Sequence, residues 1–212
     1  SHSNIFWDSG FFFVKDTNSK MLLLGFSKIS GKSYLFAGVA QLKKPKLGKP
    51  RGQEEWDVEW DEIRGVIVST ITTFTENGEI DEKALRENYS YYLKGGAHGL
   101  GVLGTTSEDH LLSKEERKRI VETARSEAKK KALVVAGSGM IGTRETVEMT
   151  KLVKDAGADV ALILSPFYQM PTEEGIVKHF KKISDSVDIP IMVYNMPPAT
   201  SNANPRVLER LC

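Results

Sequence analysis

Four side chains with hydroxyl groups stand after or at the end of apolar stretches of this sequence. They are Thr105, Thr106, Tyr168 and Tyr194. Adjacent threonine hydroxyls, together with successive backbone N–H groups, can hold a carboxylate and relay a proton. A phenol at the mouth of a site can both donate and accept a proton. The ordinary alternatives are threonines that bond to their own turn and a strand-end tyrosine that packs its ring, and both stay open at this point.

The elements that would position these residues form a regular alternation of strands and helices. Strands are predicted at 65–70, 99–104, 133–136, 160–164 and 189–194. Helices are predicted to begin after Asp81, after Ser113, at Thr143, at Thr172 and at Pro205. Alternation at a spacing of about 30 residues requires parallel strands with right-handed crossovers, so the fold class is α/β. An open doubly wound sheet and a (β/α)8 barrel both fit, and both place a site at the carboxyl ends of the strands.

Capping and turn residues mark the ends of the predicted helices. Asp81 is expected to cap a helix that runs to about Lys94. Ser113 precedes Glu116 by three residues, which is the spacing of a capping box, and its helix is expected to reach about Lys131. Both helices lie between predicted strands, as the alternation requires.

Residues 1–62 differ in character from the rest of the chain. They hold short apolar runs without a sustained period, then a Lys/Pro/Gly stretch at 42–52 and an acidic segment. We expect a poorly organised extension and linker, with a hairpin as one candidate element. The domain boundary is therefore predicted at residue 62, and 63–212 is the regular domain.

The composition is that of an ordinary globular protein and excludes several classes. The 212 residues carry a formal net charge of +1, which gives no reason to expect a nucleic acid or an anionic membrane as a partner. No apolar stretch approaches the roughly 20 residues of a membrane span. Cys212 is the only cysteine and none of the four histidines has a metal-ligand spacing, so neither a disulfide nor a metal site is expected. We expect a cytoplasmic protein, with a mitochondrial location left open.

Four segments together resemble one protein family. They are ITTFTENGEID at 71–81, GLGVLGTTSE at 99–108, SPFY at 165–168 and YNMPPAT at 194–200. In order and spacing they resemble the dihydrodipicolinate synthase/N-acetylneuraminate lyase family of Schiff-base aldolases. The resemblance covers about residues 63–211 and implies an incomplete (β/α)8 TIM barrel, made of the first five βα units. Residues 1–62 lie outside it, and we expect them to be foreign to the family.

The resemblance also implies a reaction and a role for each residue. Members bind a 2-oxo acid, usually pyruvate, as a lysine Schiff base, and the iminium is an electron sink for chemistry at the adjacent carbon. Thr105 and Thr106 would hold the keto-acid carboxylate, and Thr106 would pass protons to Tyr194. Tyr194 would be the general acid/base, and Tyr168 would reach across a dimer interface to complete the relay. No metal or dissociable cofactor is implied, and the assembly would be a homodimer or homotetramer.

Two positions depart from the family's pattern. Ser107 stands where the family has glycine, which would strain the backbone if this position had a positive φ. Ala199 stands where dihydrodipicolinate synthases have an arginine for the second substrate's carboxylate, so a bidentate partner is missing. We therefore expect a lyase or aldolase closer to the 2-keto-3-deoxy sugar-acid type, with dihydrodipicolinate synthase as the alternative.

The family's reactive lysine lies at the end of the sixth strand, beyond Cys212. No lysine in this chain matches its motif, so we expect a fragment that lacks covalent catalysis on its own. Five strands without the other three would also expose two sheet edges. A non-catalytic ligand-binding or interaction protein is a further alternative. A phosphate-binding barrel of another family is disfavoured, because no late-strand Gly-rich loop is present.

Overall fold

The computed structural model describes the backbone of most of the chain and the side chains from residue 63 onward. The described ranges are 9–15, 21–29, 32–37, 63, 65–129, 131–196 and 199–211. Within them, eight strands form one sheet in the order β3-β2-β1-β4-β5-β6-β7-β8. No helix in these ranges is long and apolar enough to cross a membrane.

Strands and helices alternate from β4 to α5. The strands are β4 (Val66–Ser69), β5 (Gly99–Val102), β6 (Leu133–Gly137), β7 (Val160–Leu164) and β8 (Ile191–Tyr194). The helices are α1 (Glu82–Lys94), α2 (Lys114–Ala128), α3 (Thr143–Asp155), α4 (Glu173–Ser186) and α5 (Pro205–Leu211). Every predicted strand and helix of the regular domain is present.

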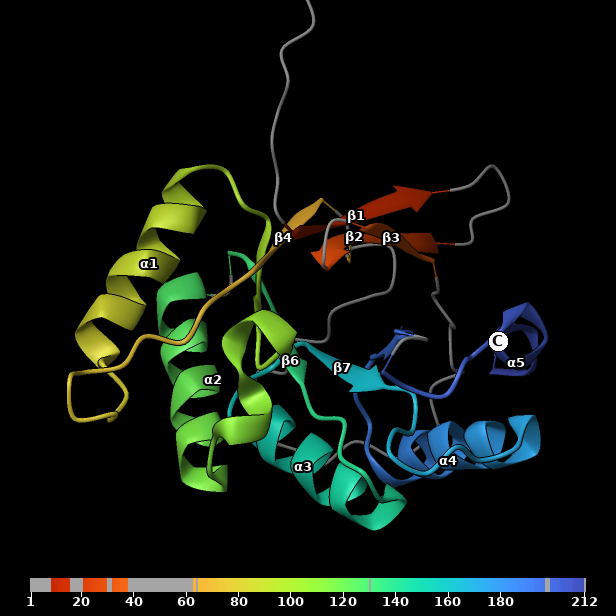
Figure 1. Ribbon diagram of the computed structural model, residues 1–212. Helices are drawn as coiled ribbons and strands as arrows, with labels where there is room; N and C mark the ends of the chain where they lie inside the picture. Colours follow the sequence, from red (N-terminus) through yellow and green to blue (C-terminus); the bar gives the residue numbers. More distant parts are fainter. Residues whose placement is uncertain are drawn as a thin grey trace, which may run out of the picture.

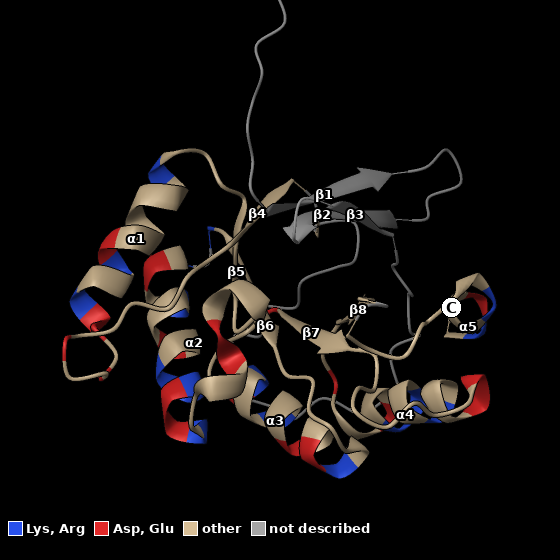
Figure 2. Ribbon diagram, in the orientation of Figure 1, with Lys and Arg blue, Asp and Glu red and all other residues tan. Residues whose placement is uncertain are grey.

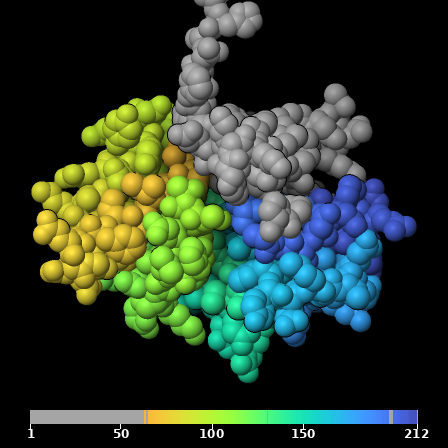
Figure 3. Space-filling view, in the orientation of Figure 1, coloured from red at the N-terminus to blue at the C-terminus, as the bar shows by residue number. Residues whose placement is uncertain are grey.

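The five strands from β4 to β8 are parallel, and each pairs with the next one in the chain. Helices α1 to α4 lie along the outer side of this sheet (Figure 1). In the space-filling view the colours pass around the molecule in chain order, so successive βα units lie side by side (Figure 3). An open doubly wound sheet would have helices on both faces. The structure is therefore the predicted partial (β/α)8 barrel.

Side chains alternate between the two faces of these strands. Val134 and Ala136 of β6 pack in a cluster with residues of α1, α2 and α3. Leu133 and Val135 belong instead to an inner cluster formed by Ile63 and residues of β4, β6, β7 and β8. Burial of one such side chain contributes roughly 1.5–3 kcal/mol, so apolar packing fixes both faces. Charged side chains lie mainly on the helices, and strands β4 to β8 carry none (Figure 2).

The capping residues act as predicted. The Asp81 side chain accepts a backbone hydrogen bond in the first turn of α1. Ser113 and Glu116 form a capping box, in which each side chain bonds to the other's backbone N–H. Helix α2 ends at Ala128, earlier than predicted, because Lys129 adopts the left-handed conformation with φ of 48°.

A buried ion pair fixes the amino ends of β6 and β7. The Asp159 carboxylate accepts hydrogen bonds from the Val134 N–H at 2.7 Å and from Arg125 Nη1 at 3.1 Å. Arg125 also donates to the Ala132 carbonyl at 2.8 Å. Burial raises the pKa of Asp159, and these two partners of its carboxylate oppose the increase. The pair lies at the end of the sheet opposite the threonines.

Three further strands precede the barrel strands: β1 (Ser9–Lys15), β2 (Met21–Ile29) and β3 (Lys32–Ala37). β2 pairs antiparallel with both β1 and β3, and β1 pairs antiparallel with β4 through Phe11 opposite Ile67 and Phe12 opposite Val66. Both edges of β4 are therefore paired, so the open sheet has its two edges at β3 and β8 and not at β4 and β8. Among the described residues, β8 has only β7 as a strand neighbour. The other residues up to 62 lie outside the described ranges, and the domain division stays a prediction.

Gly137, at the end of β6, has no room for a side chain. A Cβ there would lie 1.7 Å from the carbonyl oxygen of Leu103. Gly104 is a matched control, because the nearest atom to a Cβ there is the Ser69 hydroxyl at 4.0 Å. We expect Gly137→Ala to lower the free energy of unfolding by about 1–3 kcal/mol and Gly104→Ala to change it little. Urea unfolding of the full-length protein measures both, and equal stability of the two variants would contradict this packing.

His179 of α4 is a buried histidine whose protonation should make the fold sensitive to acid. Its Nδ1 atom lies 2.9 Å from the Thr143 hydroxyl, and its Nε2 atom has no hydrogen-bond partner among the described residues. Burial lowers the pKa of His179 to about 4. An unfolded histidine titrates at about 6.5, so between these two pH values the unfolded state binds a proton that the folded state does not. Stability should therefore fall as the pH drops through this window.

We expect His179→Asn to remove up to about 3 kcal/mol of the stability loss between pH 6.5 and pH 4. Asparagine can still bond to Thr143 but cannot be protonated in this range. Urea unfolding at a series of pH values measures the slope, with the exposed His110→Gln as the control. An acid slope that is the same in both variants would assign the sensitivity to other groups.

Candidate active site

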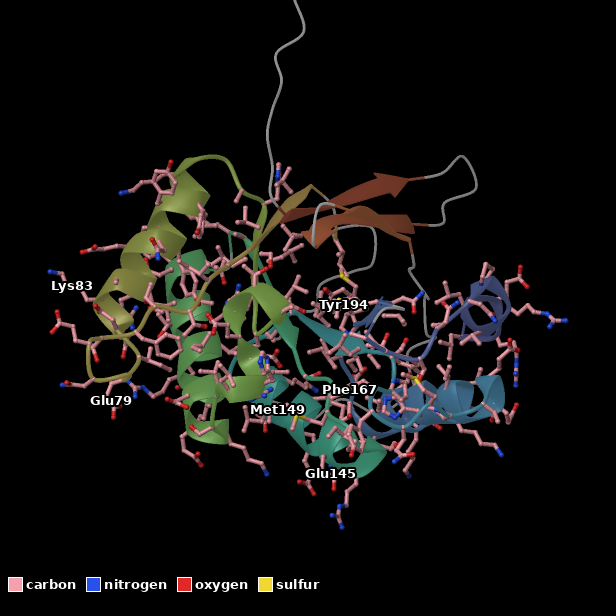
Figure 4. The ribbon with its side chains drawn as sticks, viewed as in Figure 1. Glu79, Lys83, Glu145, Met149, Phe167 and Tyr194 are labelled. Atoms are coloured by element: carbon pink, nitrogen blue, oxygen red, sulfur yellow. The ribbon has the colours of Figure 1, made fainter. Side chains whose placement is uncertain are left out.

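Tyr194 ends β8 on the inner side of the barrel. It belongs to the inner cluster together with Met192, two residues earlier on the same face, and is 8% exposed. Its phenol oxygen lies 3.4 Å from the Thr105 hydroxyl and 3.6 Å from the Met196 sulfur. Figure 4 shows Tyr194 near the centre of the molecule, away from the outer helices that carry residues such as Glu145. The structure therefore brings together two predicted site residues, Thr105 and Tyr194.

A small cavity lies beside this pair at the carboxyl ends of four strands. The residues that line it belong to or follow β5, β6, β7 and β8: Leu103, Gly104, Thr105, Asp109, Gly137, Gly139, Leu162, Leu164 and Tyr194. Its empty volume is about 240 Å³, counted with the solvent space at its mouth. Apolar walls with a few convergent polar groups are typical of a small-molecule site. This position is where both candidate folds were expected to place one.

The turn after β5 consists of two short 3₁₀ segments, η2 (Thr105–Ser107) and η3 (Asp109–Leu111), and η2 carries both threonines. Ser107 anchors this turn. Its hydroxyl donates to the Thr70 carbonyl at 2.6 Å, and its own carbonyl accepts from the Thr72 hydroxyl at 2.8 Å. Positive φ falls on Leu103 and Glu108 and not on Ser107. Serine at the family's glycine position is therefore a mild change, and its hydroxyl holds the turn.

Thr106 and Tyr168 stand apart from the pair. The hydroxyl at hydrogen-bond distance from Tyr194 is that of Thr105, not that of Thr106 as the resemblance implied. The reason is local, since a 3₁₀ segment has about three residues per turn and so points adjacent side chains in different directions. Tyr168 follows β7 with φ of 68° and its side chain is 81% exposed. Its assignment to a site shared with a second subunit stays a prediction.

Side-chain hydrogen bonds fix the segment after β8. The Asn195 side chain accepts from the Ala203 N–H at 2.9 Å. The Ser201 hydroxyl donates to the carbonyl of Pro166, which follows β7. Ala199 is exposed within this segment. Its methyl group offers no donor to a carboxylate, as the sequence indicates.

Burial controls the proton affinity of the site. Burial raises the pKa of the Tyr194 phenol; the hydrogen bond with Thr105 opposes the increase and the negative charge of Asp109 adds to it. The phenol is therefore protonated at neutral pH and can donate a proton. Asp109 pairs with Arg117, whose Nη1 atom lies 3.3 Å from its carboxylate. Burial also raises the pKa of Asp109, and Arg117 opposes that increase.

The sequence analysis missed both Asp109 and Arg117. The available signal was a carboxylate two residues beyond the Thr-Thr-Ser motif at a strand end, with an arginine in the first turns of the next helix. That helix begins with a run of charged residues, so no single one stood out. Within the described part of the chain, the cavity lining contains no lysine and no group of acidic, histidine or cysteine side chains could hold a metal ion.

Comparisons with known proteins agree with this geometry. A model of the dihydrodipicolinate synthetase family matches residues 62–212. The 4-hydroxy-tetrahydrodipicolinate synthase of Syntrophobacter fumaroxidans is 40% identical over 150 residues, which are 70% of this chain and 51% of that protein. The crystal structure of dihydrodipicolinate synthase from Aquifex aeolicus is similar with a TM-score of 0.66 and 38% identity, over 68% of this chain and 50% of that chain. The chloride-inhibited synthase from Acinetobacter baumannii, complexed with pyruvate, has a TM-score of 0.67 and 35% identity over 68% of this chain and 50% of that chain.

The chain spans about half the length of the curated relatives it matches. Those relatives are named synthases, so they do not support the expected position on the lyase and sugar-acid aldolase side, which depended on YNMPPAT and above all on Ala199. The match extends over the five βα units that carry Thr105 and Tyr194. Because the family model covers residues 62–212, well over half of the sequence, this chain belongs to the dihydrodipicolinate synthetase family.

Proposed function

We propose that this protein, in its full-length form, joins pyruvate, held as a lysine Schiff base, to an aldehyde, in the manner of a 4-hydroxy-tetrahydrodipicolinate synthase. The observation that supports this most is the 3.4 Å approach of the Thr105 hydroxyl to the Tyr194 phenol beside a cavity at the strand ends. A similar synthase has been solved with pyruvate. By resemblance to the family, the lysine belongs to the strand that follows β8.

The turn after β5 can hold the carboxylate of pyruvate. Thr105 and Thr106 present hydroxyl groups there, and hydroxyl and backbone donors bind a carboxylate without a formal positive charge. The hydrogen bonds of Ser107 to Thr70 and Thr72 fix the turn before the ligand arrives. Donors held in place in this way cost little reorganisation when the substrate binds.

Tyr194 can donate and recover the protons of the reaction. Addition of the amine to the keto carbon gives a carbinolamine, whose hydroxyl must take a proton to leave as water. The resulting iminium withdraws electrons, so the methyl carbon loses a proton and attacks the aldehyde carbon. The aldehyde oxygen then takes up a proton as it becomes a hydroxyl. Thr105 is placed to exchange protons with the phenol between these steps.

A second candidate is an aldolase of the same type whose aldehyde lacks a carboxylate. Ala199 favours it, because an alanine at this position cannot form the two parallel hydrogen bonds that an arginine gives to a carboxylate. The two candidates share pyruvate and the Schiff base and differ only in the second substrate. A change at Ala199 can therefore separate them.

Pyruvate should become covalently attached to the full-length protein when borohydride is added. We expect the mass to increase by one reduced pyruvyl group, and we expect Tyr194→Phe to slow adduct formation by about 10²–10⁴-fold because the proton donor is lost. Tyr91→Phe, at a 74% exposed tyrosine of α1, is the matched control and should react at the wild-type rate. Intact-protein mass spectrometry follows the time course. A wild-type protein that gains no mass would refute the proposed function.

Ala199→Arg should improve use of an aldehyde that carries a carboxylate. A charge-assisted hydrogen bond contributes about 1.5–3 kcal/mol, so we expect KM for such a substrate to fall by roughly 10–100-fold while KM for pyruvate stays the same. Ala199→Gln supplies a side chain of intermediate length without charge and is the control. Steady-state kinetics with a carboxylated and an uncarboxylated aldehyde measure the change. If wild type already prefers the carboxylated aldehyde and Ala199→Arg does not lower its KM, an aldolase for uncarboxylated aldehydes is excluded.

A further inference from the structure

Among the described residues that line the cavity beside Thr105 and Tyr194, Asp109 is the one with a formal charge. It begins η3, and Thr105 begins the preceding segment η2, so one turn carries both side chains. The remaining lining residues from β6 and β7 are Gly137, Gly139, Leu162 and Leu164, which carry no charge. Among the described lining residues, the charged group that shares the cavity with the phenol is therefore a carboxylate, and the sequence motif of the family does not account for it.

Arg117 holds this carboxylate in place. Its guanidinium is buried, with 5% of the side chain exposed, and the Asp109 side chain is 16% exposed. Its Nη1 atom lies 3.3 Å from the carboxylate, its Nη2 atom donates to the Asp109 carbonyl, and its Nε atom donates to the Leu112 carbonyl at 3.2 Å. Two of these contacts hold the side chain and the backbone of Asp109, and the third fixes the guanidinium to Leu112.

We propose that Asp109, held by Arg117, is a positioning residue that opposes ionisation of Tyr194 and so extends its proton-donating form to higher pH. The mechanism is electrostatic. A carboxylate beside a phenol in a partly buried cavity disfavours the phenolate, because two negative charges would then share a poorly solvated space. Arg117 stabilises the ionised form of Asp109 and so preserves the charge on which this effect depends.

The electrostatic part of this proposal is independent of catalysis, and its consequence for turnover rests on the proposed function. Burial is the largest effect and raises the pKa of the phenol, the Thr105 hydrogen bond lowers it, and Asp109 makes a smaller contribution in the same direction as burial. His110 and Arg117 are the charged or titratable groups that act on Asp109 itself. Without Asp109, the positive charge of Arg117 would remain and would favour the phenolate.

The test follows the titration of Tyr194 directly in the full-length protein. Tyrosines are replaced by 3-fluorotyrosine, whose phenol is more acidic, and ¹⁹F NMR is recorded against pH. Tyr194→Phe identifies the resonance that belongs to this residue. We expect Asp109→Asn to move its midpoint to lower pH by on the order of one unit. Glu108→Gln removes the neighbouring exposed carboxylate outside the cavity lining, and it should leave the midpoint unchanged.

Two more variants keep the test decisive if Asp109→Asn fails to fold. Asp109→Ser is a second neutral replacement and should lower the midpoint as well. Asp109→Glu keeps the negative charge, so the midpoint of the Tyr194 titration should stay near that of wild type. An unchanged midpoint in both neutral variants would overturn the proposal. An equal shift in Glu108→Gln would also overturn it, since the effect would then come from the general charge of the turn.

Kinetics with pyruvate separate this inference from the proposed function. Where wild type forms the borohydride-trapped adduct, the alkaline limb of kcat against pH should move to lower pH in Asp109→Asn and stay in place in Glu108→Gln. An alkaline limb that stays in place in Asp109→Asn would overturn the role in turnover. A wild-type protein without an adduct would remove the proposed function alone, because the fluorine titration still decides whether Asp109 acts on Tyr194.

Discussion

The alternation of side chains along β8 determines where the phenol lies. Ile191 and Val193 pack in the cluster beneath α4 and α5, whereas Met192 and Tyr194 face the inner side of the barrel. A slip of one residue would turn Tyr194 toward the helices and place a valine in the cavity. The pairing of Leu164 with Tyr194 opposes that slip, together with apolar burial on both faces. The site thus depends on strand register before it depends on any polar contact.

Curvature of the sheet then brings distant strand ends together. Thr105 follows β5 and Tyr194 ends β8, so β6 and β7 lie between them. Three strand spacings of about 4.8 Å each would separate them by roughly 14 Å in a flat sheet. The two hydroxyl oxygens are 3.4 Å apart, which requires a curved sheet with both side chains on its concave side. The close contact between Gly137 and Leu103 helps to set this approach, because any side chain at Gly137 would push the turn away.

Local signals in the sequence were enough to predict the strands and helices of the barrel. Strand positions follow from apolar runs, and helix starts follow from side chains such as Asp81 and Ser113 that bond to the backbone nearby. The fold class and the threonine turn could be predicted for the same reason. The expected position on the sugar-acid aldolase side depended mostly on one residue, Ala199, and the named relatives do not support it.

Tertiary contacts decide the features that the sequence did not reveal. Leu103 and Glu108 are not glycines, yet both have positive φ, which the surrounding turn imposes on them. Which threonine meets the phenol depends on the rotation of a 3₁₀ segment, and two adjacent identical residues carry no signal for that choice. The buried contact of Arg117 with Asp109 spans a loop and a helix start, where a run of charged residues concealed it.

The charges of Asp109 and Arg117 form a dipole, which would not repel the pyruvate of the proposed function. A lone carboxylate about 5 Å from the carboxylate of pyruvate would repel it by roughly 3 kcal/mol at an effective dielectric constant of about 20. Arg117 lies within 3.3 Å of Asp109, so at the distance of the cavity mouth the two charges nearly cancel. Near the phenol the cancellation is incomplete, because Asp109 lines the cavity and Arg117 does not. The pair can therefore act on Tyr194 over a short range without opposing the entry of an anion.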